Sequence, residues 1–259
     1  MTVRTTERCE IALSTGAGRV TTAVEVPTGF VPVSSIVPLL NRLSEKAQDL
    51  ELAEASTAGK VVSCRKGCAA CCRMLVPVSA PEAFAIRDYV RSSPAERQQW
   101  FSARFDEARI LLESKGLWDQ FVELGETEHT IGDDDLASLN QQYYALQVPC
   151  PFLQDDLCSI YDVRPAACRE LLVTSPSTLC GDIVNNPVEP VAVPLRTTSV
   201  LGLLWADLSG TAARLIPLPI VFKWVERHQA ERNKSWTGTE LLDRALDKAW
   251  RLLSQALSH

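Results

Sequence analysis

Eight of the nine cysteines in this chain fall in two groups. Four lie within residues 64–72, and four more are spread over residues 150–180. The eight are Cys64, Cys68, Cys71, Cys72, Cys150, Cys158, Cys168 and Cys180. Thiolates at such close spacing repel one another unless a cation takes up their charge or they oxidise. The spacing therefore predicts a metal site built from these sulfurs.

On an α-helix, the first group would present its four sulfurs on one face. At about 100° per residue, its cysteines would lie within an arc of about 100°, with i,i+4 neighbours about 5–6 Å apart at Cβ. We therefore expect this group to be helical, with one cysteine from the second group folding back over it. Cys9 stands alone near the start of the chain and is expected to take no part.

Composition limits the location of the protein. With 259 residues, 46% of them hydrophobic, the chain can bury a core in one domain or at most two. The first twenty residues lack a continuous apolar segment, so no signal peptide is expected. Residues 200–225 are apolar but are interrupted by Asp207 and Pro217, among others, which argues against a membrane span. A cytoplasmic location follows, and there clustered cysteines are metal ligands or catalysts more often than disulfides.

Charge and the remaining polar residues exclude several functions. The net charge is −6, with no basic stripe, so we expect neither nucleic acid nor membrane as partner. An unknown protein is left as partner or substrate.

The acidic run 133–135 is interpreted as a helix start, because the later ligands of a calcium loop are missing. His129, His228 and His259 stand apart from the cysteines, and no Ser–His–Asp arrangement is visible.

Local patterns predict a mostly α fold with a small N-terminal β-hairpin and an irregular, cysteine-rich, metal-centred core. Residues 148–190 are rich in proline and show no sustained period, so a metal would have to order them. The expected elements are a hairpin over residues 8–27, a helix over 34–55 ended by Gly59, helices opened by the capping pairs Ser79/Glu82 and Ser93/Glu96, a helix over 135–147, a strand over 191–198 and a last helix capped by Thr239.

This pattern divides the chain into three regions. Residues 1–60 form an N-terminal hairpin and helix extension, and residues 61–190 form the cysteine-cluster metal-binding region. Residues 191–259 form a C-terminal helical region that packs on the same core.

Two arginines lie among the second group of cysteines. Arg164 and Arg169 could hydrogen-bond thiolate or sulfide and offset the negative charge of a four-thiolate site. They could equally form ordinary salt bridges to Asp155, Asp156 or Asp162. Both interpretations stay open at the level of sequence, and Asp155 and Asp156 are expected to form a solvated turn.

The order of these motifs resembles a known family. The pattern C-x3-C-x2-CC, followed by CPFL, C-x-IY-x-x-RP-x-x-CR and a further Cys, resembles the YkgJ-like cysteine-cluster family, described as zinc- or iron-chelating, over about residues 60–185. It is also similar to the cysteine pattern of the flagellin lysine-N-methylases. The resemblance implies a metal site at all eight cysteines and leaves zinc and iron open. It implies an accessory, redox or structural role, or alternatively an enzyme such as a cluster-dependent protein lysine N-methylase.

The cysteine spacing favours an iron–sulfur cluster over zinc. Structural zinc sites are usually built from paired C-x2-C knuckles, and only Cys68–Cys71 has that spacing. Two such sites would make the protein a structural zinc interaction module. A third interpretation, a radical S-adenosylmethionine enzyme, rests on the spacing Cys64-x3-Cys68-x2-Cys71 alone. It is disfavoured because Ala70 replaces the usual aromatic residue and Cys72 threatens to fill the open iron position.

Overall fold

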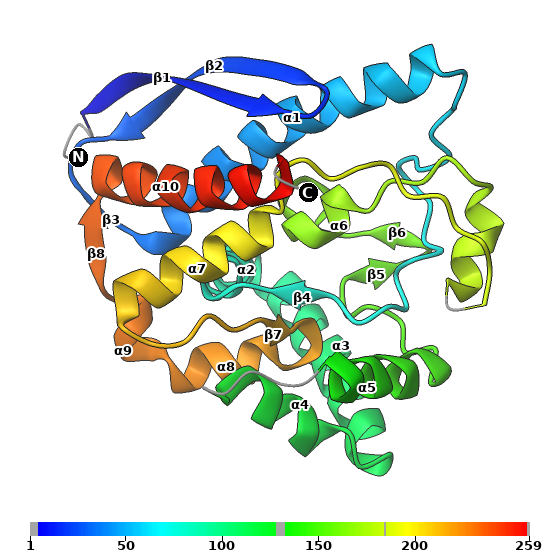
Figure 1. Ribbon diagram of the computed structural model, residues 1–259. Coiled ribbons are helices and arrows are strands. Elements are labelled where there is room, and N and C mark those ends of the chain that lie inside the picture. Colours follow the sequence, from blue (N-terminus) through cyan, green and yellow to red (C-terminus); the bar gives the residue numbers. More distant parts are fainter. Residues whose placement is uncertain (1–4, 128–132, 184, 258–259) are drawn as a thin grey trace.

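The structure, a computed structural model, describes residues 5–127, 133–183 and 185–257. More than half of the described residues lie in helices, which confirms the predicted mostly α fold (Figure 1). The α-helices are α1 (Val37–Thr57), α2 (Ala80–Ser92), α3 (Ala95–Ser114), α4 (Trp118–Glu126), α5 (Asp133–Ala145), α6 (Ala166–Glu170), α7 (Thr197–Ser209), α8 (Val221–Arg227), α9 (Gln229–Arg232) and α10 (Gly238–Leu257). The strands are β1 (Thr6–Thr15), β2 (Gly18–Pro27), β3 (Phe30–Pro32), β4 (Pro77–Val78), β5 (Leu153–Gln154), β6 (Leu157–Cys158), β7 (Ile216–Pro217) and β8 (Ser235–Thr237).

The predicted N-terminal hairpin is confirmed. Strands β1 and β2 pair antiparallel, with Leu13 opposite Val20 and Cys9 opposite Val24. Side chains alternate between buried and exposed along both strands, as they do in a sheet with one covered face. The hairpin lies over α1 and α10 at the top of the molecule (Figure 1). Its apolar face therefore closes one side of the core.

The middle of the core lies where α2, α7 and α8 meet. Phe84 of α2 packs against Trp205 of α7 and Trp224 of α8, with ring centroids 5.5 Å apart in both pairs. Helix α7 also contacts α1, α6 and α10. The segments that carry the second cysteine group thus attach to this core through α6.

Most predicted helix boundaries agree with the structure, and the capping residues agree less well. Helix α1 ends near Gly59, which has φ +76°, and α5 begins with the acidic run. The Ser79/Glu82 capping box forms. The Ser93/Glu96 box does not: α3 starts after Pro94, and the Ser93 hydroxyl donates to the Tyr89 carbonyl instead.

Two predictions near the C-terminal region are wrong. No strand forms over residues 191–198. The chain there is irregular, and α7 already begins at Thr197, whose backbone N–H donates to the Glu170 carboxylate. The last helix is not capped by Thr239. Thr237 accepts the Glu240 N–H at 3.2 Å, because the chain enters α10 two residues earlier.

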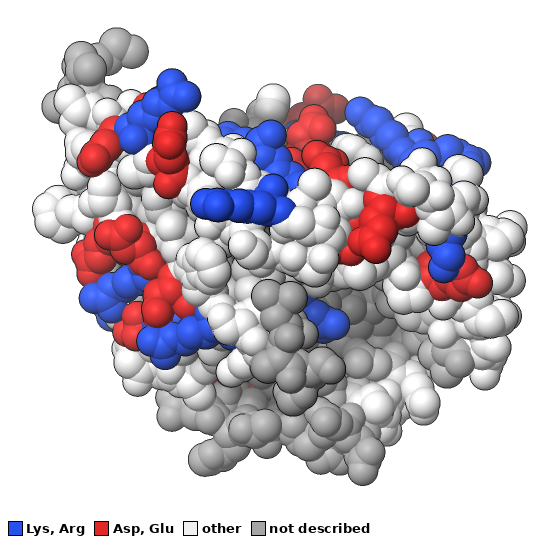
Figure 2. Space-filling model, turned by 45° about the horizontal axis from the view of Figure 1, so that its top comes forward, with Lys and Arg blue, Asp and Glu red and all other residues white. Residues whose placement is uncertain are grey.

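The surface carries charges of both signs side by side. Figure 2 shows Lys and Arg lying among Asp and Glu on the face that includes the top of Figure 1. Several of these charges pair, as Arg244 does with Asp207 at 3.1 Å and with Glu240 at 2.9 Å. None of the helices in the described ranges is both long and apolar enough to cross a membrane.

Candidate metal centre

The first cysteine group is not helical, and the prediction of a one-face helix is wrong. Residues 58–76 form successive turns between α1 and β4. The Cys68 N–H donates to Arg65, the Cys72 N–H to Ala69, and the Met74 N–H to Cys71, each at 3.0–3.1 Å. Each bond closes a four-residue turn, and Gly67 has φ +90°, which ends any helix at that point. The turns nevertheless keep the four sulfurs of the group close together.

The second group is held by short pieces of structure. Strands β5 and β6 form a hairpin whose tip is Asp155–Asp156, both with positive φ, so the predicted solvated turn is confirmed. Cys158 ends this hairpin, Cys168 lies in the five-residue α6, and Cys180 lies in a 3-10 turn. Apolar anchors hold the segment to the core. Phe152, for example, is buried against Phe101 of α3, with ring centroids 5.3 Å apart.

Backbone hydrogen bonds join the two groups directly. The Cys150 N–H donates to the Cys72 carbonyl at 2.8 Å. The Ser63 N–H donates to the Val173 carbonyl at 2.9 Å, and the Val173 N–H donates to the Cys64 sulfur at 3.4 Å. Segments some eighty residues or more apart in sequence thus lie side by side. This is the arrangement that ligands shared between the two groups require.

A buried carboxylate on α2 fixes the turn that presents Cys168. Glu82 is 1% exposed and accepts the backbone N–H and hydroxyl of Ser79 at 2.8 and 2.7 Å. Its second oxygen accepts the Ala166 N–H of α6 at 2.9 Å and the Thr198 hydroxyl at 3.4 Å. Burial raises the pKa of Glu82, and these hydrogen bonds act in the opposite direction. One side chain therefore joins α2, α6 and α7.

All nine cysteines have free thiols, and Cys71 lies in the middle of the clustered eight. Its thiol contacts that of Cys72, and this contact, with burial, raises the pKa of Cys71. When ionised, Cys71 also raises the pKa of thiols in both groups. These are the thiols of Cys64, Cys150, Cys158, Cys168 and Cys180. Cys9 has only carboxylates as charged neighbours and lies apart from this centre.

The thiols divide into two sets that do not follow the sequence. Burial raises the pKa of Cys180, and the nearby thiols of Cys64, Cys71 and Cys68 raise it further. Cys180 therefore lies beside the first group. Burial raises the pKa of Cys168 well above the ordinary value, and the nearby thiols of Cys150, Cys71 and Cys158 raise it further. We call Cys64, Cys68 and Cys180 the first set, and Cys150, Cys158 and Cys168 the second set. The adjacent Cys71 and Cys72 complete the eight.

The surroundings of the sulfurs suit a metal more than free thiolates. Burial, with the nearby thiols of Cys158 and Cys71, raises the pKa of Cys150 to about 12, so this thiol stays protonated unless a cation takes the place of its proton. Backbone N–H groups two residues further along, at Phe152 and Ile160, favour the ionised forms of Cys150 and Cys158. Hydrogen bonds of this kind stabilise metal-bound thiolate.

The side chains are gathered without being at coordination spacing. Among the residues that the structure describes, no three His, Cys, Asp or Glu side chains are arranged closely enough to hold a metal ion as they stand. A donor set of sulfurs alone fits zinc or an iron–sulfur core by its chemistry. A single tetrahedral ion would require the sulfurs to move closer together.

The two arginines differ in their partners. Arg169 pairs with the Glu45 carboxylate and donates to the carbonyls of Asp162 and Arg164, so it forms a salt bridge, although not to the expected aspartates. Arg164 stacks over Tyr161, with its guanidinium carbon 4.1 Å from the ring centroid. Burial raises the pKa of the Cys64, Cys158 and Cys168 thiols, and the charge of Arg164 acts in the opposite direction. Arg169 has the same opposing effect at Cys158, so the charge-offsetting interpretation is supported mainly for Arg164.

The histidines add no ligand in the described ranges. His228 stacks on Trp224 at 3.9 Å between ring centroids, and its Nδ1 lies 2.8 Å from the Trp224 carbonyl oxygen, in agreement with a packing role. His129 and His259 lie outside the described residues.

Comparison with known families agrees with this geometry. Residues 63–181 match the model of a family described as "CxxCxxCC: Putative zinc- or iron-chelating domain". The matched stretch contains all eight clustered cysteines and leaves out Cys9. A search of curated proteins and a search of solved structures each found no match. Residues 63–181 are thus similar to this family, described as zinc- or iron-chelating, and the match includes every cysteine of the two groups.

Proposed function

We propose that the protein binds metal at two four-thiolate sites and serves an accessory role, redox or structural. The observation that carries the proposal is the convergence of thiols from two distant segments around Cys71. The first set with Cys71 makes one site, and the second set with Cys72 makes the other. When bound, the metal supplies the positive charge that these buried thiolates need, together with electron transfer if it is an iron–sulfur cluster.

An iron–sulfur cluster at the first set is favoured over zinc. A zinc ion holds four sulfurs at about 2.3 Å each, so the sulfurs must lie about 4 Å apart. Zinc sites are usually built from paired C-x2-C knuckles, and Cys68–Cys71 is the single pair of clustered cysteines with that spacing, which supports a sulfide-containing core. Arg164, which has no ion pair to a carboxylate among the described residues, would offset part of the negative charge of such a cluster.

Anaerobic purification, followed by analysis of iron, zinc and sulfide and a visible absorption spectrum, tests the proposal. Replacing Cys68 by Ser exchanges a soft thiolate for a hard, weakly acidic hydroxyl, so iron should be lost or become labile to chelators. Cys9→Ser is the matched control and should leave the metal content unchanged, because Cys9 lies apart on β1. Colourless wild-type protein that holds two zinc ions per chain would refute the cluster.

Removing the metal should loosen one segment before the rest. Residues 148–190 hold only short elements, whereas α1 is packed against the core, so chelation should raise amide hydrogen exchange in the segment first. Mass-spectrometric exchange with and without chelator measures this effect. Protection that is equal in both samples over 148–190 would mean that metal does not order the segment.

A further inference from the structure

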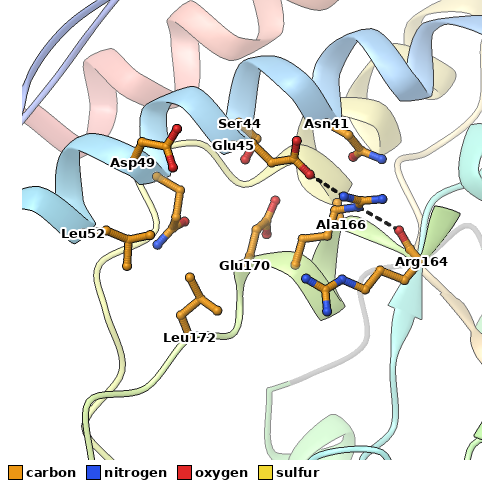
Figure 3. Close-up of a pocket in the computed structure, with 11 residues that line it drawn as sticks. Asn41, Ser44, Glu45, Asp49, Leu52, Arg164, Ala166, Glu170 and Leu172 are labelled. Atoms are coloured by element: carbon orange, nitrogen blue, oxygen red, sulfur yellow. Dashed lines mark hydrogen bonds and ion pairs between the residues drawn. The ribbon is translucent and has the colours of Figure 1, made fainter. Parts of the chain in front are cut away.

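A cavity of about 140 Å³ lies between α1 and α6. None of the eight clustered cysteines lines it. One ordered water needs roughly 10–15 Å³ of such space, so the cavity has room for a group of several heavy atoms. In Figure 3, side chains of α1 and α6 face each other across it, and Glu170 extends from α6 toward α1.

Two buried amide oxygens border this cavity without hydrogen-bond partners among the described residues. Gln48 is 6% exposed, and its Nε2 donates to the Ala192 carbonyl at 2.9 Å, which fixes the orientation of the amide and leaves Oε1 unpaired. Asn41, about two turns before Gln48 on α1, is 8% exposed and has an unpaired Oδ1. Buried acceptors without a donor are costly. A ligand that enters here is therefore expected to bring N–H or O–H donors.

The charge of the cavity favours a cation. Asp49 forms no ion pair with another described residue. Glu170 accepts the Thr197 N–H at 2.7 Å, and burial raises the pKa of Glu170 to about 7, so Asp49 is the stronger source of negative charge here. Arg169 is already engaged by Glu45 and by two backbone carbonyls.

Arg164 also lines the cavity, with its guanidinium stacked over Tyr161, and it keeps its positive charge. The two arginines face the carboxylates of Glu45, Asp49 and Glu170, so the lining carries at most one net negative charge, and Asp49 is the carboxylate without a partner among the described residues.

The lining selects an organic cation over a metal ion. A Ca²⁺ ion takes about six to eight oxygen ligands, whereas Glu45 is engaged by Arg169, which leaves two carboxylates at the cavity. Leu52, Ala166 and Leu172 supply apolar wall beside them. An alkylammonium group combines three N–H donors with an alkyl chain, and at pH 7 it is charged, since amines of this type have a pKa of about 10.4.

We propose that this cavity binds a primary alkylammonium group. Asp49 and Glu170 balance its charge, the Gln48 and Asn41 oxygens accept its N–H groups, and the apolar wall contacts its chain. The site is separate from the proposed metal centre and does not depend on which metal is bound there.

The test is titration of the metal-loaded protein with n-butylammonium chloride, followed by calorimetry and by NMR of the side-chain amides. Butan-1-ol, which has the same chain without the charge, should not bind. Tetramethylammonium, which has the charge without N–H donors, should bind at least about tenfold more weakly than n-butylammonium. The proposal fails if n-butylammonium causes no change up to tens of millimolar, or if butan-1-ol binds equally well.

Paired variants locate the site. Asp49→Asn should weaken n-butylammonium binding about tenfold, because a charge-assisted hydrogen bond becomes a neutral one. Asp119→Asn, which makes the same change at an exposed position on α4, should stay within about twofold of the wild type. Asn41→Leu should also weaken binding about tenfold without lowering the melting temperature, since its oxygen has no partner to lose. Equal affinities for Asp49→Asn and Asp119→Asn would overturn the assignment.

The source of the amine is a separate arm of the same experiment. Nα-acetyl-lysine amide carries the ammonium group on a side chain, whereas n-butylammonium represents a free amine. Tighter binding of the lysine derivative would identify a side chain as the occupant. Binding of n-butylammonium alone would identify a small free amine.

Discussion

Replacing Cys71 with serine should release the metal of the first site and make the metal of the second site labile. Its thiol contacts that of Cys72 and acts electrostatically on all three thiols of the second set and on two of the first set, Cys64 and Cys180. The substitution removes a ligand of the first site and leaves a weakly acidic hydroxyl facing the second. We expect at least half of the bound metal to be lost, and the remainder to become labile to chelators.

Metal content per chain, measured for matched variants, separates this result from general damage. Cys68→Ser, which changes only the first set, should lose metal from one site and keep the other. Cys9→Ser should keep both. A Cys71→Ser protein with the full metal content of the wild type would exclude Cys71 from both sites.

Replacing Glu82 with alanine should lower the free energy of unfolding by about 3–4 kcal/mol. The change leaves the Ser79 and Ala166 N–H groups and the Thr198 hydroxyl without their acceptor, and all of these groups are inside the protein. Urea denaturation with linear extrapolation measures the loss. Hydrogen exchange should also increase at α6, because its first N–H loses its partner.

Glu96→Ala is the matched control for this prediction. Glu96 has the same position in an identical Ser-x-x-Glu pattern, but its capping box does not form. Its replacement should cost less than about 1 kcal/mol, the effect of one negative charge in the first turn of a helix. Equal losses in the two variants would show that the long-range bonds of Glu82 contribute little.

These two Ser-x-x-Glu pairs show what the sequence could and could not predict. Both patterns correctly placed a helix start, because apolar periodicity follows each of them. Only Ser79/Glu82 forms the box, since Glu82 is also bonded by Ala166 and Thr198, more than eighty residues away. Contacts of that range leave no local trace in a sequence. The cavity between α1 and α6 went unpredicted for the same reason.

The candidate metal centre divides in a similar way. Residue type and spacing predict eight cysteines as ligands and leave Cys9 out, and this stays a prediction; the structure brings the segments of the two groups side by side. The prediction from the helical wheel is wrong for the first group because Gly67 and four-residue turns shape that segment. The joining of Cys180 with Cys64 and Cys68 follows from the folded chain alone, since the two segments meet only after α2 to α6 are in place.

The distance along the chain between the sulfurs of the first set bears on how the protein is assembled. Cys64 and Cys180 are more than a hundred residues apart, and closing so long a loop has an entropic cost that no short knuckle has. The contact of Phe84 with Trp224 spans a loop of similar length, but it buries two large aromatic side chains, whereas the cysteine segments hold only turns and short elements and depend on the metal for their order. We therefore expect the helices packed around Phe84 and Trp224 to form first and the metal to enter a chain that is already compact. Cells starved of metal would then accumulate a folded precursor awaiting its ions, rather than an unfolded polypeptide marked for degradation.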